Sequence, residues 1–477
     1  MSKNIFFIVK NSHLIFILRT FSKKEVRDFR KWNQSPSHNQ RDDVISLFEY
    51  LVAGNHLAEE KYLKKERIYS KLFPKSEFDD ARLRQTMHFL LKSIEEYLIY
   101  KEFREDQVQA KLVLAGIYRK RKLDKVFQRT INGIQQLQER SELRDEVYLR
   151  NEYLLQKSLY DFLSEKKRTT SINLQEVSDA LDITFCADKL RQACLMLAHQ
   201  KVYKAEYNMG ILGHIISYVE NNNYLEIPAI SIYYFIYKAS KEKEDTSFFE
   251  KLKSAIIENG QLFPSNERRD IYLMAINYCI SKLNIGKREF IREAFELYRQ
   301  GLEDETLVDG NVLTQFTFSN IVNIGCVLKE YVWVESFIKN YQQYLPNKYR
   351  ESYVTLTTAR LYFDKGDYQR AMKLLAQFDD DDVIVTLNGK AMLLKMYYEE
   401  KEDDALESLL ESMRNYVHRK KMIGYYKDIY SNLIKYTRKL LRINPYDKKQ
   451  KEKLRKEINE ANPLPERKWL MEQLEKI

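Results

Sequence analysis

Glycine and proline are scarce in this chain, and their scarcity limits how the backbone can reverse direction. The sequence holds 13 glycines and 8 prolines among 477 residues, whereas average usage is about 7% and 5%. Tight β-turns depend on these two residues, so few turns of that kind can form. The apolar fraction of 44% is sufficient for a buried core. We therefore predict an all-α protein built from helices with short connections.

Helix start and stop signals define the first part of the chain. Ser22 with Glu25 three residues later predicts a capping box. Asp42 follows a proline-containing break and predicts the start of another helix. Apolar residues at helical spacing predict one long helix over 77–103. Residues 1–103 are therefore expected to form a helical N-terminal region.

The middle of the chain, residues 104–285, continues this helical pattern. Three of its predicted helices span 108–119, 123–138 and 146–164. No run of alternating apolar and polar residues bounded by turn signals indicates a strand. Long helices with short links favour antiparallel pairs, so we expect an array of helix pairs here.

A two-helix unit recurs over residues 286–418. In its clearest copy an aromatic residue closes the first helix, Gly366 forms the turn, and Ala371 allows the two helices to approach closely. A small or β-branched residue returns at spacings of 40, 37 and 34 residues along the chain. The residues that we expect to pack the repeated helices together are Ala294, Tyr331, Val334, Tyr362, Gly366, Tyr368, Ala371 and Ala405.

This unit resembles the tetratricopeptide repeat, which implies a curved superhelix, or α-solenoid, that binds proteins or peptides. The resemblance covers about a third of the chain, and Thr355 stands where the repeat commonly has a tryptophan. The whole chain also resembles a group of uncharacterised bacterial helical proteins. The segments that carry this second resemblance are Phe21 to Glu25 with Ser35-Pro36, Lys329 to Tyr331, and Lys468 to Leu470. It implies no activity.

Residues with catalytic or metal-binding chemistry are not clustered in the sequence. The seven histidines are scattered, the four cysteines never form a CxxC pair, and no phosphate-binding glycine loop is present. We expect no catalytic residue, cofactor or metal, and a cytoplasmic, reducing environment. The apolar stretch near the N-terminus, interrupted at Lys10, leaves a weak signal segment as an alternative.

The net charge of +10 is concentrated near the C-terminus. Residues 414–456 hold fifteen Lys or Arg against three Asp or Glu. Most of this segment belongs to residues 419–477, which we predict to form basic C-terminal helices. The residues that could contact an anion or nucleic acid are Arg414, Arg419, Lys420, Lys421, Lys435, Arg438, Lys439 and Arg442. A ridge of this kind binds phosphates in a salt-dependent manner, although basic helix faces are often only solvated.

The sequence therefore predicts a non-enzymatic scaffold or adaptor. We expect it to bind an unidentified protein or peptide on a helical-repeat surface, because stacked helix pairs offer a broad face for recognition. A nucleic-acid-associated or regulatory role of the basic C-terminal region is the alternative. No membrane span is expected, since no uncharged apolar run is long enough.

Overall fold

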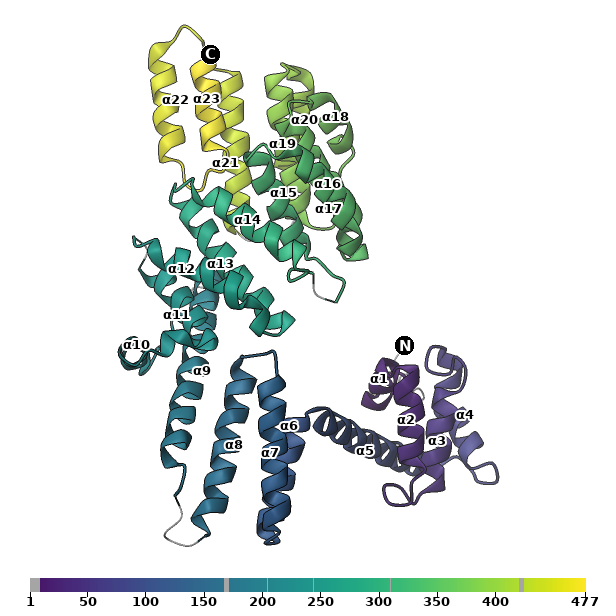
Figure 1. Cartoon of the computed structure of the whole chain (residues 1–477). Coiled ribbons are helices and arrows are strands. Elements are labelled where there is room, and N and C mark those ends of the chain that lie inside the picture. Colours follow the sequence, from purple (N-terminus) through teal and green to yellow (C-terminus); the bar gives the residue numbers. More distant parts are fainter. Residues whose placement is uncertain (1–8, 167–170, 204, 243, 309, 420–423) are drawn as a thin grey trace. The chain divides into compact units, whose positions relative to one another are not determined.

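The computed structural model describes residues 9–166, 171–203, 205–242, 244–308, 310–419 and 424–477. These residues form helices and connecting loops, with no strand among them. The chain divides into two compact units (Figure 1). Unit 1 comprises residues 1–141 and 147–184, and unit 2 comprises residues 142–146 and 185–477. No described helix combines the length and the apolar composition needed to cross a lipid bilayer.

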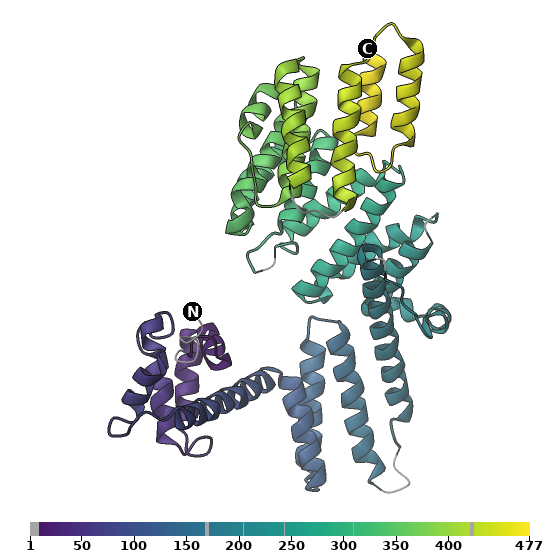
Figure 2. The same ribbon diagram turned by 180° about the vertical axis from the view of Figure 1, so that it is seen from behind.

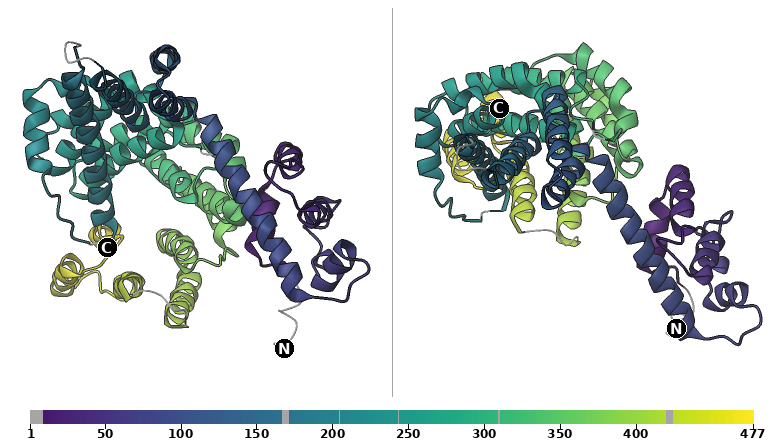
Figure 3. Two further views of the ribbon diagram at one scale, coloured as in Figure 1. Left: turned by 90° about the horizontal axis from the view of Figure 1, so that it is seen from below. Right: turned by 60° about the horizontal axis from the view of Figure 1, so that its bottom comes forward.

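Unit 1 begins with five helices around their own apolar core. Their bounds are α1 (His13–Thr20), α2 (Lys23–Asn33), α3 (Asp42–Val52), α4 (Lys65–Leu72) and α5 (Asp80–Glu105). A short 3₁₀ turn, η2 (Glu60–Tyr62), precedes α4. Ile15, Phe29, Phe48 and Leu83 are fully buried in this core. Figure 3 shows α5 as a single long helix that leaves this bundle.

The capping box predicted at the start of α2 is confirmed. The backbone N–H of Glu25 donates to Ser22 Oγ at 3.2 Å, and the backbone N–H of Ser22 donates to Glu25 Oε2 at 2.8 Å. Lys101 Nζ on α5 donates to the other carboxylate oxygen at 2.9 Å. The Ser22 backbone and the Lys101 ammonium together lower the pKa of Glu25 to about 2. The start of α2 is thereby fixed to α5.

The rest of unit 1 is a group of long helices. Their bounds are α6 (Gln107–Lys120), α7 (Asp124–Arg140), α8 (Glu146–Ser164) and the first part of α9 (Leu174–Tyr203). The rings of Phe127 and Phe162 stack in their core with centroids 4.2 Å apart. The three helices predicted over 108–119, 123–138 and 146–164 correspond to α6, α7 and α8.

Unit 2 continues α9 into fourteen further α-helices within the described residues. The bounds are α10 (Leu212–Asn221), α11 (Pro228–Lys241), α12 (Ser247–Asn259), α13 (Ser265–Asn284), α14 (Phe290–Glu303), α15 (Gln315–Val327), α16 (Tyr331–Tyr341), α17 (Asn347–Asp364), α18 (Tyr368–Leu375), α19 (Val383–Glu399), α20 (Asp403–Arg419), α21 (Gly424–Leu441), α22 (Lys448–Glu460) and α23 (Arg467–Lys476). Three 3₁₀ turns, η3 (Tyr224–Glu226), η4 (Gly260–Leu262) and η5 (Gln342–Tyr344), link them.

Consecutive helices of unit 2 pack as pairs. The pairs are α11 with α12, α13 with α14, α15 with α16, α17 with α18, and α19 with α20. The first helices of successive pairs also touch, α15 against α17 and α17 against α19. Figure 2 shows these green helices from behind, with α21 to α23 following in yellow. The all-α, solenoid-like fold predicted from the sequence is therefore confirmed.

The same backbone turn joins the helices in four successive pairs. Gly366 adopts φ +79°, and the next N–H, of Asp367, donates to Tyr362 O at 2.9 Å. Lys329 and Lys401 adopt the same left-handed conformation, with φ +60° and +59°. Their following N–H groups also donate to the carbonyl five residues back. Gly286 makes the same turn between α13 and α14, with φ +89° and the Lys287 N–H donating to Lys282 O at 3.1 Å. The turn is therefore formed both with and without glycine, and the two copies at lysine carry no glycine signal in the sequence.

The turn defines how the repeated units align. Five residues after the left-handed residue come Val334, Ala371 and Leu406, which are all fully buried. Ala405, which the 34-residue spacing selects, is half-buried instead. The turns at Gly366 and Lys401 are 35 residues apart, whereas the predicted repeat has a spacing of 34. The residue equivalent to Ala371 is therefore Leu406 and not Ala405.

Gly325 allows α16 to pack closely on α15. A Cβ atom at Gly325 would lie 2.4 Å from Val334 Cγ2 and 3.2 Å from Phe295 Cε2. The first distance is far below ordinary van der Waals contact, and the second is a few tenths of an ångström below it. The pair α15 and α16 thus combines a glycine on one helix with a valine on the other, whereas the next pair combines Tyr362 with Ala371 at the same two positions.

We predict that Gly325→Ala destabilises unit 2 by about 2 kcal/mol, because overpacking a well-filled interface outweighs the better helix propensity of alanine. Gly116 in α6 is the comparison, since a Cβ there meets no heavy atom within 4 Å. Gly116→Ala should stabilise its unit by about 0.5 to 1 kcal/mol. Urea denaturation followed by circular dichroism measures both. Equal stabilisation by the two alanines would contradict the packing argument.

Candidate functional site

Five of the predicted repeat-packing residues are either fully buried or bonded to the next helix pair. Ala294 on α14, Val334 on α16 and Ala371 on α18 are fully buried. The hydroxyl of Tyr331 donates to Asp364 O at the end of α17, at 2.7 Å. The hydroxyl of Tyr368 donates to Glu399 Oε2 at the end of α19, at 2.6 Å. Each of these tyrosines therefore ties the second helix of one pair to the first helix of the next.

A groove with both apolar and polar side chains on its walls lies between α16 and α17. Its volume is about 580 Å³. Tyr362, the remaining aromatic packing residue, lies on its wall together with Val354 and Leu361 of α17. On the α16 side Val332 is 85% exposed. An aliphatic side chain that is so fully exposed on a groove wall offers apolar area to a partner.

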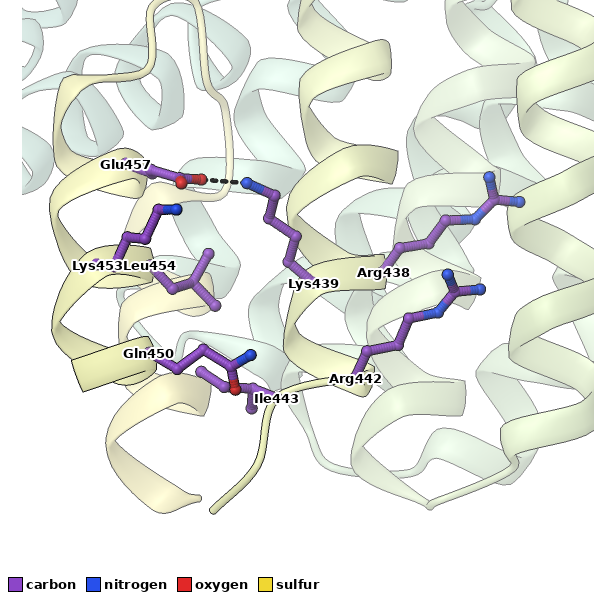
Figure 4. Close-up of a pocket in the computed structure, with 8 residues that line it drawn as sticks. All are labelled: Arg438, Lys439, Arg442, Ile443, Gln450, Lys453, Leu454 and Glu457. Carbon is purple, nitrogen blue, oxygen red and sulfur yellow. Dashed lines mark hydrogen bonds and ion pairs between the residues drawn. The ribbon is translucent and has the colours of Figure 1, made fainter. Parts of the chain in front are cut away.

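The basic residues predicted near the C-terminus line two hollows on either side of α21. Arg414, Lys435 and Arg438 line a hollow of about 330 Å³ between α20 and α21. Arg438 also lines a hollow of about 290 Å³ between α21 and α22, together with Lys439 and Arg442 (Figure 4). The other three predicted residues lie elsewhere. Arg419 is exposed and donates to Asn415 O, and Lys420 and Lys421 lie outside the described residues.

Carboxylates from neighbouring helices partly neutralise these cations. Arg438 Nη2 lies 2.8 Å from Glu411 Oε2, and Arg442 Nη2 lies 3.7 Å from Glu407 Oε1. Lys439 forms an ion pair with Glu457 of α22, drawn as a dashed line in Figure 4. The figure also shows both guanidinium groups directed away from α22. The basic residues of α21 are therefore interspersed with carboxylates from α20 and α22 and do not form a continuous cationic surface.

The hollow between α21 and α22 has an aliphatic base and polar or charged side chains around it. Ile443 and Leu454 are buried at its base, and the side-chain stems of the arginines form one wall. The hydrogen bond from Lys439 lowers the pKa of Glu457, so its carboxylate stays charged at the rim. The glutamates of these pairs lie on α20 and α22, which is why the charge pattern of α21 alone could not reveal them.

The cysteines of the core are poor nucleophiles. Burial raises the pKa of the Cys326 thiol to about 12 and raises that of Cys279 still further. Within the described ranges, no group of three or more His, Cys, Asp or Glu side chains is arranged to hold a metal ion. The acidic run at residues 379–382 has a capping role instead, because Asp382 accepts from the Ile384 N–H at the start of α19 at 2.8 Å.

The chain was compared with models of protein families, with curated proteins and with solved structures, and none of them matches it.

Proposed function

We propose that the chain is a non-enzymatic scaffold that binds a protein or peptide on the surface of its tetratricopeptide-like helix pairs. The observation that carries this proposal is the groove between α16 and α17, with Val332 85% exposed on its wall. Tyr331 on α16 donates to the end of α17 and so ties together the two helices that form this groove, which is therefore a preformed surface. A preformed groove with an exposed aliphatic side chain on its wall favours binding of an extended or helical segment at low ordering cost.

We expect Val332→Glu to abolish capture of the partner, because a carboxylate in the groove would have to be desolvated on binding. The measurement is affinity purification from the native cell, with the full chain as bait. Val113→Glu is the matched control, since Val113 on α6 is 51% exposed and lies in the other unit. A partner that is retained by wild type and by Val113→Glu, but reduced at least tenfold by Val332→Glu, supports the proposal.

Nuclease treatment of the same lysate tests the alternative. A nucleic-acid-associated or regulatory role is favoured by the gathering of Arg414, Lys435, Arg438 and Arg442 around α21. If that role is correct, the captured material is lost on nuclease treatment, and its retention falls steeply with salt. If the captured material survives nuclease and is retained equally by Val332→Glu and Val113→Glu, both proposals are wrong: partner binding in the groove and association with nucleic acid.

A further inference from the structure

The hollow between α20 and α21 combines a cationic rim with an apolar base. Val417 and Ile434 are buried at the base, with 2% and 5% of their surfaces exposed. Arg414 and Lys435 are exposed at the rim, one from each helix. His418 and Ser431 complete the wall with the side chain of Arg438. No carboxylate lines this hollow among the described residues.

Two arginines of this hollow converge on one carboxylate next to it. Glu411 Oε2 lies 2.8 Å from Arg438 Nη2 and 3.6 Å from Arg414 Nη1. The hydrogen bond from Arg438 lowers the pKa of Glu411. Arg438 Nε is buried with no acceptor among the described residues. The positive charge of Lys435 acts on Glu457 of α22, which does not line this hollow. Arg414 and Arg438 therefore share one acidic neighbour, and their guanidinium groups already bind a carboxylate beside this hollow.

We propose that the hollow between α20 and α21 binds an acidic segment of a partner protein, with a carboxylate at Arg414 and Lys435 and an adjacent aliphatic side chain on Val417 and Ile434. This proposal rests on the scaffold function and names the chemistry of one partner segment. A carboxylate complements the positive charges of Arg414 and Lys435, and an aliphatic side chain can pack on Val417 and Ile434 between them.

Nucleic acid fits the same hollow less well. No Phe, Tyr or Trp side chain lines it among the described residues, so His418 is the single ring there on which a base could stack. Glu407 and Glu411 lie beside Arg442 and Arg438, and a continuous chain of phosphates along α21 would meet these carboxylates. A short acidic peptide needs few cations and meets only Glu411, whereas a chain of phosphates would also meet Glu407.

The test uses the full chain and a fluorescein-labelled peptide in which glutamates flank a pair of leucines, with binding followed by fluorescence anisotropy at low salt. Three further probes replace the glutamates by glutamines, replace the leucines by serines, or substitute a single-stranded oligonucleotide of equal charge. We expect the acidic, leucine-containing peptide to bind at least tenfold more tightly than each of the other three.

Matched variants locate the binding site. Arg414→Gln with Lys435→Gln should weaken binding of the acidic peptide at least tenfold. Lys448→Gln with Lys449→Gln removes the same charge from an exposed part of α22 that lines neither hollow, and should change binding less than twofold. All four positions are exposed, and circular dichroism checks that each variant is folded.

Several outcomes would overturn the proposal: no binding of the acidic peptide, equal effects of the two double variants, or tighter binding of the oligonucleotide. These outcomes are distinct from failure of the scaffold function. If Val332→Glu still abolishes capture of a cellular protein while the acidic peptide does not bind, the scaffold stands and the acidic-segment site is wrong.

Discussion

Glu399→Ala is expected to lower the free energy of unfolding of unit 2 by about 3 kcal/mol, because it removes the acceptor of three side chains. Trp469 Nε1 of α23 donates to Glu399 Oε1 at 2.6 Å, and Gln473 Nε2 donates to the same oxygen at 3.3 Å. The Tyr368 hydroxyl donates to the other oxygen at 2.6 Å. Trp469 and Gln473 are buried, so their donors would lose their protein acceptor without gaining full access to water.

The Glu399 carboxylate joins α18, α19 and α23. Its removal should therefore increase local opening of these helices before the whole unit unfolds. Hydrogen exchange of α18 and α23 amides is expected to accelerate in Glu399→Ala, since both helices are anchored to the end of α19 through this side chain. Glu400→Ala is the control, because Glu400 is the next residue and is exposed. Exchange rates that are the same in both variants would show that α23 is held by its apolar face alone, through Leu470 and Leu474.

Arg191→Ala is expected to destabilise unit 2 by about 2 to 3 kcal/mol, because it leaves a buried carboxylate without its cation. Arg191 Nε on α9 lies 3.2 Å from Glu267 Oε1 on α13, whose side chain is 8% exposed. Tyr233 of α11 donates to the same oxygen at 2.5 Å, and Arg191 also pairs with Glu146. Breaking a fully buried ion pair costs about 3 to 5 kcal/mol. We expect a smaller cost here because the Arg191 side chain is 35% exposed and partly screened by water.

The pH dependence of this effect has a definite sign. Burial raises the pKa of Glu267 above its ordinary value of 4.5. A carboxyl whose pKa is higher in the folded state opposes folding when ionised, so its contribution to stability improves as the pH falls from neutral toward 4.5. Arg191→Ala should steepen this dependence, and Glu267→Gln should flatten it.

Denaturant titrations at several pH values measure both effects. The double variant Arg191→Ala with Glu267→Gln should recover most of the stability that is lost in Arg191→Ala, because no charge then remains buried. Arg370→Ala is the matched control, since the Arg370 side chain is 68% exposed in its pair with Asp367 and should cost less than about 0.5 kcal/mol. An Arg191→Ala protein as stable as Arg370→Ala would refute the argument.

Local features of the fold could be predicted from the sequence because their interactions span a few residues. The capping box of Ser22 and Glu25, the start of α3 at Asp42 and the long helix α5 all depend on neighbours within one or two turns. The burial of Ala371 likewise follows from helical spacing next to a glycine turn. These features are set by residues close to one another in the sequence, so the sequence alone reveals them.

The sequence by itself thus determined that the chain is helical, where many helices begin and end, and that pairs of them recur. Only the tertiary structure decided which side chains meet across pairs. Glu399 and Trp469 are separated by 70 residues, and the glutamates that neutralise Arg438 and Lys439 belong to other helices. Lys329 and Lys401 are exposed and adopt the left-handed conformation within helix-ending turns, which the residue type lysine does not signal in the sequence. Charge and contact between distant segments are properties of the packed chain, and no periodicity along one helix encodes them.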